Sequence, residues 1–292
     1  MSHRPRTIQI YLPSGDPRGI RVARLTTHIM QVFEVPRALL PQFLAMPESQ
    51  RVAVYYLVGD DEASETPMAY IGQTGDLKVR LNDHHRSKDF WSRALVAVSL
   101  SDILTQTHAL YLEWLSIKLA GETGRYKVTN GNTGSRPQAP APLVADCDEI
   151  FDNVRMLLAT LGQPIFESLS KPKEAAAKRE ELYYCTYAGS DAVGEYTEEG
   201  FVVLKDSKAR LEMAPSMVKM GFDKRRQALI ADGTLVAEGG ALVFQRDVLF
   251  KTPSGASDMV AGASTNGWTL WKTKDGKTLD ELKRQATPPA LT

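Results

Sequence analysis

The first half of the chain alternates between hydrophobic and polar positions mostly with the two-residue period of β-strands. Residues 7–12 (TIQIYL) and 20–25 (IRVARL) are short alternating runs separated by the turn-forming PSGDPRG. Residues 52–59 (VAVYYLVG) and 68–72 (MAYIG) flank an acidic loop, which predicts a β-hairpin. The apolar run at 90–100 (FWSRALVAVSL) predicts a third strand beside it.

Helical patterns follow these strands. A helix is predicted from about Leu77 to His85, with Thr74 or Asp76 as its N-cap. Pro36 is placed to open a short helix, and Gly121 is placed to end a long apolar one. The three further helical segments cover residues 36–46, 103–120 and 148–162.

The sharpest change in composition is the alanine-rich, charged segment KPKEAAAKREE at 171–181, which predicts a helical linker. We therefore expect an N-terminal β-rich extension (1–50), a first domain (51–170) and a second small α+β domain (182–292).

Turn and helix signals also punctuate the second domain. Gly239-Gly240 predicts the turn of a hairpin, and Thr252 and Gly262 predict the two ends of a helix. The segment WTLWK (268–272), between two turn-forming dipeptides, predicts a strand.

Composition narrows the class of protein. Of 292 residues, 43% are hydrophobic, and 35 basic residues balance 35 acidic ones. No apolar run is long enough to span a bilayer, and the opening MSHRPRTIQIYLPSGD lacks the apolar centre of a signal peptide. Cys147 and Cys185 stand far apart without a CxxC spacing, so a disulfide framework or zinc ribbon is not expected. These features predict a soluble cytoplasmic protein.

A set of chemically active residues gathers around the predicted hairpin. Tyr55 and Tyr70 lie on neighbouring strands, and Arg80 and His84, four residues apart, share one helix face. Glu113 follows on an otherwise apolar helix. Because a buried polar group without a partner costs roughly 2–7 kcal/mol, this carboxylate needs a cation or an open cleft.

Each member of this set also has a structural interpretation. Tyrosines on strands usually pack in a core, and Tyr56, one residue after Tyr55, is predicted to face the core on the opposite side of the sheet. Arg80 could pair with Asp76 or Asp83 on its own helix instead of binding a ligand.

Four segments together resemble the GIY-YIG nuclease superfamily, over about Val52 to Asn132. These segments are VYYLVG, AYIGQTGDLKVRLNDHH, YLEWL and TNGN. The resemblance implies a small antiparallel three-stranded sheet flanked by helices, of the α+β class. It also implies hydrolysis of phosphodiester bonds with Mg²⁺ (or Mn²⁺), leaving a 5′-phosphate. Ala53 stands where the family name has a glycine.

The resemblance also assigns roles residue by residue. It implies that Glu113 binds the metal, and that the catalytic residues are Tyr55, Tyr70, Arg80, His84 and Asn130, with Asn132 as the alternative to Asn130. A tyrosine made more acidic by a metal and an arginine can act as a base, and a guanidinium can hold phosphoryl oxygens. Gln73 and Lys78, beside the second motif, are expected to contact nucleic acid.

Residues 250–282 resemble the domain of unknown function that often follows GIY-YIG modules in bacteria, and more loosely the small domains attached to restriction and adenine-methylase systems. Lys224, Arg225 and Arg226 on one predicted helix could contact DNA phosphates, as could the lysines at 272, 274 and 277. The competing interpretation is that these are ordinary solvated charges and that Trp268 and Trp271 are core residues.

The sequence therefore predicts a metal-dependent DNA endonuclease, with RNA as an alternative substrate. A second interpretation is a catalytically weak protein that keeps the nuclease fold and binds nucleic acid or another partner. Residues 51–170 contain 11 basic and 15 acidic residues, a net negative charge that favours this second interpretation.

Overall fold

In a computed structural model the described part of the chain forms two compact units, one within residues 5–167 and one within residues 168–285. The structure describes residues 5–60, 66–101, 103–131, 134–170, 182–219 and 222–285. The predicted linker at 171–181 and the alternative asparagine, Asn132, lie outside these residues.

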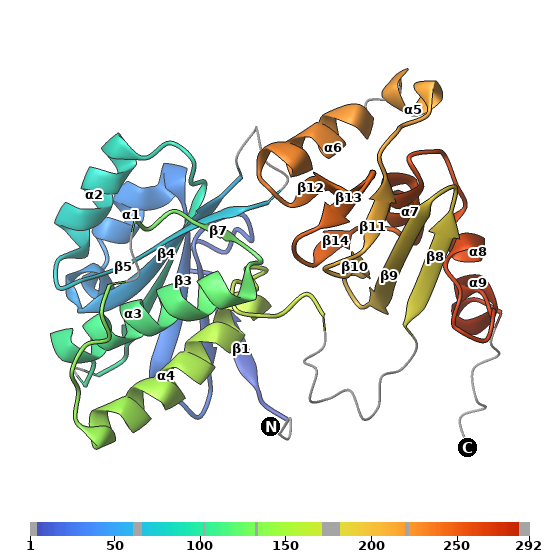
Figure 1. Cartoon of the computed structure of the whole chain (residues 1–292). Helices are drawn as coiled ribbons and strands as arrows, with labels where there is room; N and C mark the ends of the chain where they lie inside the picture. The colour runs from blue at the N-terminus through green and yellow to red at the C-terminus, as the bar shows by residue number, and fades with distance from the viewer. Residues whose placement is uncertain are drawn as a thin grey trace, which may run out of the picture. The chain divides into compact units, whose positions relative to one another are not determined.

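The N-terminal unit is built on a seven-stranded sheet with helices on both faces (Figure 1). The strand order is β1-β2-β3-β6-β4-β5-β7, and only the β5–β7 pair is parallel. The strands are β1 (Ile8–Tyr11), β2 (Arg21–Leu25), β3 (Met30–Pro36), β4 (Ala53–Gly59), β5 (Met68–Thr74), β6 (Arg93–Ser99) and β7 (Lys127–Val128). The helices are α1 (Leu40–Leu44), α2 (Leu77–Ser87), α3 (Gln106–Thr123) and α4 (Ala141–Thr160), with 3₁₀ turns at Arg37–Leu39 and Pro47–Gln50.

The α+β class is confirmed, but the expected sheet of three strands is too small. The β4–β5–β6 sheet continues through β3 into β2 and β1, so the N-terminal extension belongs to the same sheet. The hydrophobic pattern did not predict a strand at β3, because Gln31 and Glu34 interrupt its apolar positions. Both are buried, and Glu34 accepts ion pairs from Arg21 on β2 and from Arg93 on β6, at 3.2 Å for Arg93. The ion-paired Glu34 thus lies inside a strand, at a position where the sequence pattern suggests that the strand is interrupted.

Every residue of β4 is buried, because each face of the strand belongs to a different core. Val54 and Tyr56 pack into the core beneath α3 and α4. Ala53, Tyr55 and Leu57 pack into the core beneath α1 and α2. The prediction that Tyr56 faces the opposite core is confirmed: its hydroxyl lies 3.1 Å from Ser116 Oγ on α3. The two-residue alternation of β4 therefore directs Tyr55 toward α2 and Tyr56 toward α3.

Helix ends follow the predicted capping residues closely. Asp76 is the N-cap of α2, and its carboxylate accepts from the amide of Val79 at 3.0 Å. The expected end of α3 at Gly121 is wrong, since the helix continues to Gly124, which adopts the left-handed conformation.

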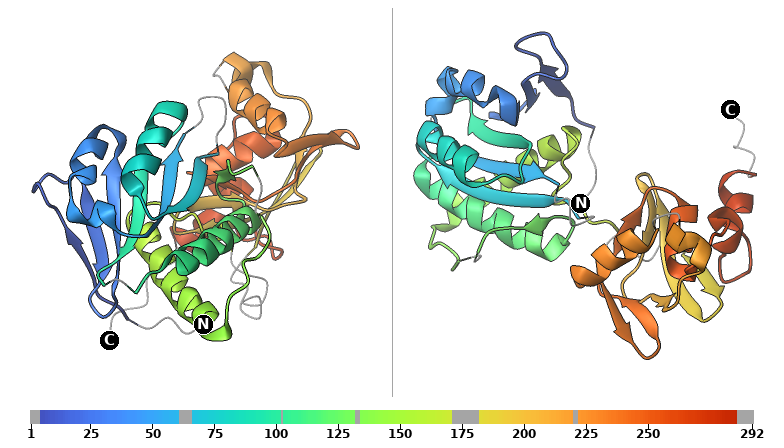
Figure 2. Two further views of the ribbon diagram at one scale, coloured as in Figure 1. Left: turned by 90° about the vertical axis from the view of Figure 1, so that its left-hand side faces the viewer. Right: turned by 90° about the horizontal axis from the view of Figure 1, so that it is seen from above.

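The C-terminal unit has a second antiparallel sheet, in the order β12-β13-β11-β9-β10-β14 with β8 paired to β9 (Figure 2). Its strands are β8 (Tyr183–Tyr187), β9 (Ser190–Thr197), β10 (Gly200–Val203), β11 (Lys208–Arg210), β12 (Leu235–Glu238), β13 (Ala241–Phe244) and β14 (Val248–Phe250). Its helices are α5 (Pro215–Lys219), α6 (Phe222–Ala231), α7 (Pro253–Ala261), α8 (Gly267–Leu270) and α9 (Leu279–Lys283).

Most local predictions for this unit are confirmed. The hairpin β12–β13 turns at Gly239 and Gly240, both with positive φ, and Thr252 and Gly262 cap α7. The predicted strand at 268–272 is wrong. Asn266 accepts from the amide of Trp268 and starts the short helix α8 instead. Trp271 is fully buried, and its ring lies 4.3 Å from that of Phe201.

In the described part of the chain, no helix is both long and apolar enough to cross a membrane. Cys147 and Cys185 are free thiols, each buried in the core of a different unit, and burial raises the pKa of both to about 12. They are therefore unreactive packing residues.

The shared sheet leads to a prediction about where the chain can be divided. A fragment of residues 1–170 should be soluble and melt cooperatively, because it retains the whole sheet. A fragment of residues 51–170 should aggregate, because the loss of β3 exposes the edge of β6 and both cores. Circular dichroism and size-exclusion chromatography of the two fragments test this. A cooperatively folded 51–170 fragment would mean that β1–β3 are accessory.

Candidate active site around Tyr55 and Arg80

Four of the predicted residues meet at one end of β4, β5 and α2. The Tyr55 hydroxyl lies 2.9 Å from Nε2 of His84, and Arg80 Nε donates to the same hydroxyl at 3.2 Å. A terminal nitrogen of Arg80 donates to the Tyr70 hydroxyl at 3.4 Å. Residues from two strands and one helix are thus joined in a single hydrogen-bonded cluster.

A close approach between strands positions Tyr55. Gly72 on β5 lies opposite Tyr55 in the sheet register, and a Cβ at Gly72 would lie 2.3 Å from the Tyr55 hydroxyl oxygen. The phenol ring therefore lies across the space that a side chain on β5 would occupy. The glycine of the YIG segment is therefore explained by its packing against the Tyr55 ring.

Burial determines the protonation states of Tyr55 and His84, which share a hydrogen bond. Burial raises the pKa of Tyr55, although the hydrogen bond from Arg80 opposes the change. Burial lowers the pKa of His84 to about 4, and the nearby charges of Arg80 and Lys88 lower it further. At neutral pH the pair is therefore a neutral phenol hydrogen-bonded to a neutral imidazole. The hydrogen bond from Arg80 lowers the pKa of Tyr55, as expected for an arginine, but desolvation of the phenolate is the larger effect.

Arg80 has no carboxylate within ion-pair distance among the described residues. Among the described residues, Arg80 therefore does not form the alternative ion pair with Asp76 or Asp83. Asp76 is occupied as the helix cap. Arg80 is exposed, and its guanidinium has five N–H groups, so donors remain for an external anion.

Lys88 is a member of this site that the sequence pattern did not indicate. It follows α2 directly, and its ammonium lies 4.3 Å from the centre of the Tyr70 ring. Arg80 and Lys88 therefore present two cations beside one half-buried tyrosine. The eight-residue spacing between Arg80 and Lys88 is not a recognisable motif. The position of Lys88 in the site becomes visible only in the structure, where α2 ends at Ser87.

Glu113 is half-buried on α3, and burial raises the pKa of its carboxylate. A hydrogen bond from the backbone of Gln73 and the charge of Arg80 both act in the opposite direction. Its charge also acts on Tyr55, which puts the carboxylate in electrostatic reach of the tyrosine cluster.

These properties fit a divalent cation. A bound cation would offset the burial of this carboxylate, and Mg²⁺ commonly takes one or two carboxylates and completes its shell with water. Within the described residues there is no group of three or more His, Cys, Asp or Glu side chains arranged to hold a metal. Glu113 would therefore be the carboxylate that holds the ion.

The remaining residues of the expected nuclease site have structural contacts. Asn130 accepts from the Ile71 amide at 3.0 Å and donates to the Ile71 carbonyl at 2.7 Å, and so continues the β5–β7 pairing. It thereby holds β5, the strand that carries Tyr70. Gln73 accepts a side-chain hydrogen bond from Gln106, and Lys78 is exposed.

The basic residues expected on α6 do not form one surface. Arg226 is buried, with 5% of its surface exposed, and donates to the carbonyls of Arg210, Leu211 and Met259. It is therefore unavailable to a phosphate, and its predicted role in binding DNA is wrong. The Arg225 guanidinium lies 4.6 Å from the centre of the Phe250 ring, and Lys224 is exposed.

Comparison with known proteins matches only the second unit. Residues 183–283 match the family described as a domain of unknown function, DUF4357. No match to the GIY-YIG family was found, so the nuclease resemblance rests on the motif residues. No curated protein and no solved structure matches the chain.

The contact between Tyr55 and Gly72 can be tested with a matched pair of substitutions. Gly72→Ala should lower the free energy of unfolding by about 1–3 kcal/mol, because the new methyl group collides with the buried phenol. Gly75→Ala is the control, since its nearest neighbour would be an ordinary 3.5 Å contact. Urea denaturation measures both. Equal stability of the two variants would contradict the packing described here.

The neutral, buried His84 also predicts a pH dependence. Its folded-state pKa of about 4 lies below the unfolded value near 6.5, so the unfolded chain binds the proton more strongly between these values. Stability should therefore fall as the pH drops from 6.5 toward 4. In His84→Gln this part of the loss should be absent. Thermal melts of both proteins at pH 7 and pH 4.5 measure the difference, and an identical drop in melting temperature would contradict the assignment.

Proposed function

We propose that the N-terminal unit is a divalent-metal-dependent endonuclease that hydrolyses phosphodiester bonds in DNA. The observation that carries the proposal is the cluster in which Arg80 bonds both Tyr55 and Tyr70 while His84 bonds Tyr55. The motif resemblance selects the same residues, together with Glu113. Two cations on an otherwise acidic module give a local positive site for a phosphate.

In this proposal Arg80 holds the phosphoryl group. Its guanidinium is fixed by two tyrosine hydroxyls and keeps further N–H donors for phosphoryl oxygens. Lys88 adds a second positive charge over the ring of Tyr70. Charge that develops on the phosphoryl oxygens during displacement is thereby stabilised by groups already in position.

Tyr55 and His84 provide a path for a proton. With Nε2 of His84 unprotonated, the hydroxyl oxygen would take a proton from an attacking water as its own proton passes to the imidazole. Such a relay needs no phenolate, which the burial of Tyr55 disfavours. Tyr70 is half-buried and is the more accessible of the two hydroxyls to substrate.

Glu113 would hold Mg²⁺ or Mn²⁺. A metal bound there supplies positive charge for the phosphoryl oxygens and the leaving oxygen. The protein's own contribution at this position is a single carboxylate kept partly dry by α3 and aligned by the Gln73 backbone. The product expected from the resemblance is a 5′-phosphate and a 3′-hydroxyl.

The second candidate function is nucleic-acid or partner binding without efficient cleavage. The specific observation in its favour is that the Asn130 amide bonds both the N–H and the carbonyl of Ile71 on β5, which gives one expected catalytic group a structural role. The net negative charge of residues 51–170 also favours it. RNA is an alternative substrate, and a cytoplasmic location remains the expectation from composition.

Glu113 provides the test. Glu113→Gln keeps the side-chain shape and removes the charge, so Mg²⁺-dependent nicking of plasmid should fall by at least about a hundredfold, or roughly 2.7 kcal/mol in the barrier. Glu122→Gln is the control, because Glu122 lies on the same helix and pairs only with Lys118 at 3.8 Å. The assay compares Mg²⁺ with EDTA for all three proteins. Equal nicking by wild type and Glu113→Gln would overturn the site. Binding of DNA without nicking by wild type would favour the second function.

A further inference from the structure

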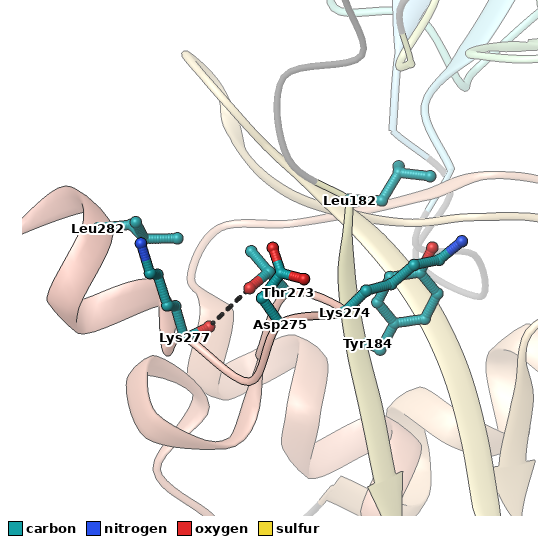
Figure 3. Close-up of a pocket in the computed structure, with 7 residues that line it drawn as sticks. All are labelled: Leu182, Tyr184, Thr273, Lys274, Asp275, Lys277 and Leu282. Carbon is teal, nitrogen blue, oxygen red and sulfur yellow. Dashed lines mark hydrogen bonds between the residues drawn. The ribbon is translucent and has the colours of Figure 1, made fainter.

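A cleft in the C-terminal unit joins an aromatic ring to two lysines (Figure 3). It is lined by residues of β8, of the turn that precedes α9 and of α9 itself, and its volume is about 430 Å³. That volume falls in the range of small-molecule sites, roughly 300–1,000 Å³. The cleft is far in sequence from α6, where the basic residues of this unit were expected to act.

The turn is held rigidly against β8. Tyr184 and Lys272 exchange two backbone hydrogen bonds, at 2.7 and 3.1 Å. Thr273 and Lys277 close the turn through a backbone hydrogen bond of 2.9 Å, and Gly276 adopts a positive φ of 81°. The backbone that carries the lysines is thus fixed relative to the tyrosine ring.

The side chains divide into a flat wall and a charged rim. Tyr184 is half-buried and lines the cleft at the end where Lys274 lies, whereas Leu282 lies at the opposite end beside Lys277 (Figure 3). Lys274 and Lys277 are exposed, and the Lys274 ammonium lies 5.7 Å from the centre of the Tyr184 ring. This distance exceeds a stacking contact of roughly 3.5–4 Å, so the lysine is near the ring without covering it closely. Asp275, on the same turn, adds an acceptor for hydroxyl or amino groups.

We infer that this cleft binds a nucleotide, with its base against Tyr184 and its phosphate at Lys274, while Lys277 adds positive charge at the opposite end of the cleft. A nucleotide combines a planar ring with an anionic group a few bonds away, as the cleft combines an aromatic wall with a cationic rim. Stacking of a base on an aromatic side chain contributes about 1–3 kcal/mol and tolerates any base. The same chemistry is present in a free nucleotide and in a nucleotide of a single strand. The inference does not depend on the proposed nuclease activity of the other unit.

The experiment measures binding of a fluorescent etheno-AMP to the full-length protein. Lys274→Gln/Lys277→Gln should weaken binding at least about tenfold, and Tyr184→Leu at least about fivefold, while Tyr184→Phe keeps the ring and the affinity. Lys208→Gln/Lys251→Gln is the control, because both lysines are exposed in the same unit and do not line the cleft. Loss of the signal in Lys274→Gln/Lys277→Gln but not in Lys208→Gln/Lys251→Gln assigns it to the cleft.

Competition then identifies the source of the nucleotide. Displacement by an unlabelled single-stranded oligonucleotide at lower concentration than by AMP supports a strand, and the reverse supports a free nucleotide. No binding by wild type at millimolar concentration would overturn the inference, as would equal binding by the two double-lysine variants. Displacement by inorganic phosphate as effectively as by AMP would also overturn it, because the base would then contribute nothing.

Discussion

The burial of β4 on both faces is the constraint on which the N-terminal unit depends. Tyr55 and Tyr56 are neighbours in the chain, yet their side chains enter two different cores. Tyr56 reaches Ser116 on α3, whereas Tyr55 reaches His84 on α2. A shift of β4 by one residue would exchange the two tyrosines and leave α2 without its partner. The strand register therefore positions the candidate site as strictly as it positions the hydrophobic core.

Desolvation also determines the chemistry available to this site. The same burial that fixes Tyr55 raises its pKa and lowers that of His84 to about 4. Both groups are thereby kept neutral at physiological pH. Arg80 stays at the exposed edge, where its charge costs little and its remaining donors face outward. The site thus combines the buried, neutral pair of Tyr55 and His84 with the more accessible positive charges of Arg80 and Lys88.

In the C-terminal unit, too, buried and exposed basic residues have different surroundings. Its most deeply buried cation, Arg226, satisfies backbone carbonyls at the end of α7 and around β11, and so stabilises the fold. The exposed lysines of the turn before α9 have no comparable structural bonds through their side chains and lie beside the half-exposed ring of Tyr184. A cluster of basic residues in a sequence does not show which of them are buried and which are exposed, because burial depends on what packs against the helix.

The local pattern determined the strands of the hairpin, the caps of α2 and α7, the Gly-Gly turn and the spacing of Arg80 and His84, since each depends on residues only a few positions apart. The strand β3 could not be predicted, because Glu34 is buried only by virtue of Arg21 and Arg93 from other strands. The backbone role of Asn130, the cation beside Tyr70 and the reversal of the Tyr55 pKa required the fold. Each of them arises from a contact or a burial between segments distant in sequence, which a local pattern does not contain.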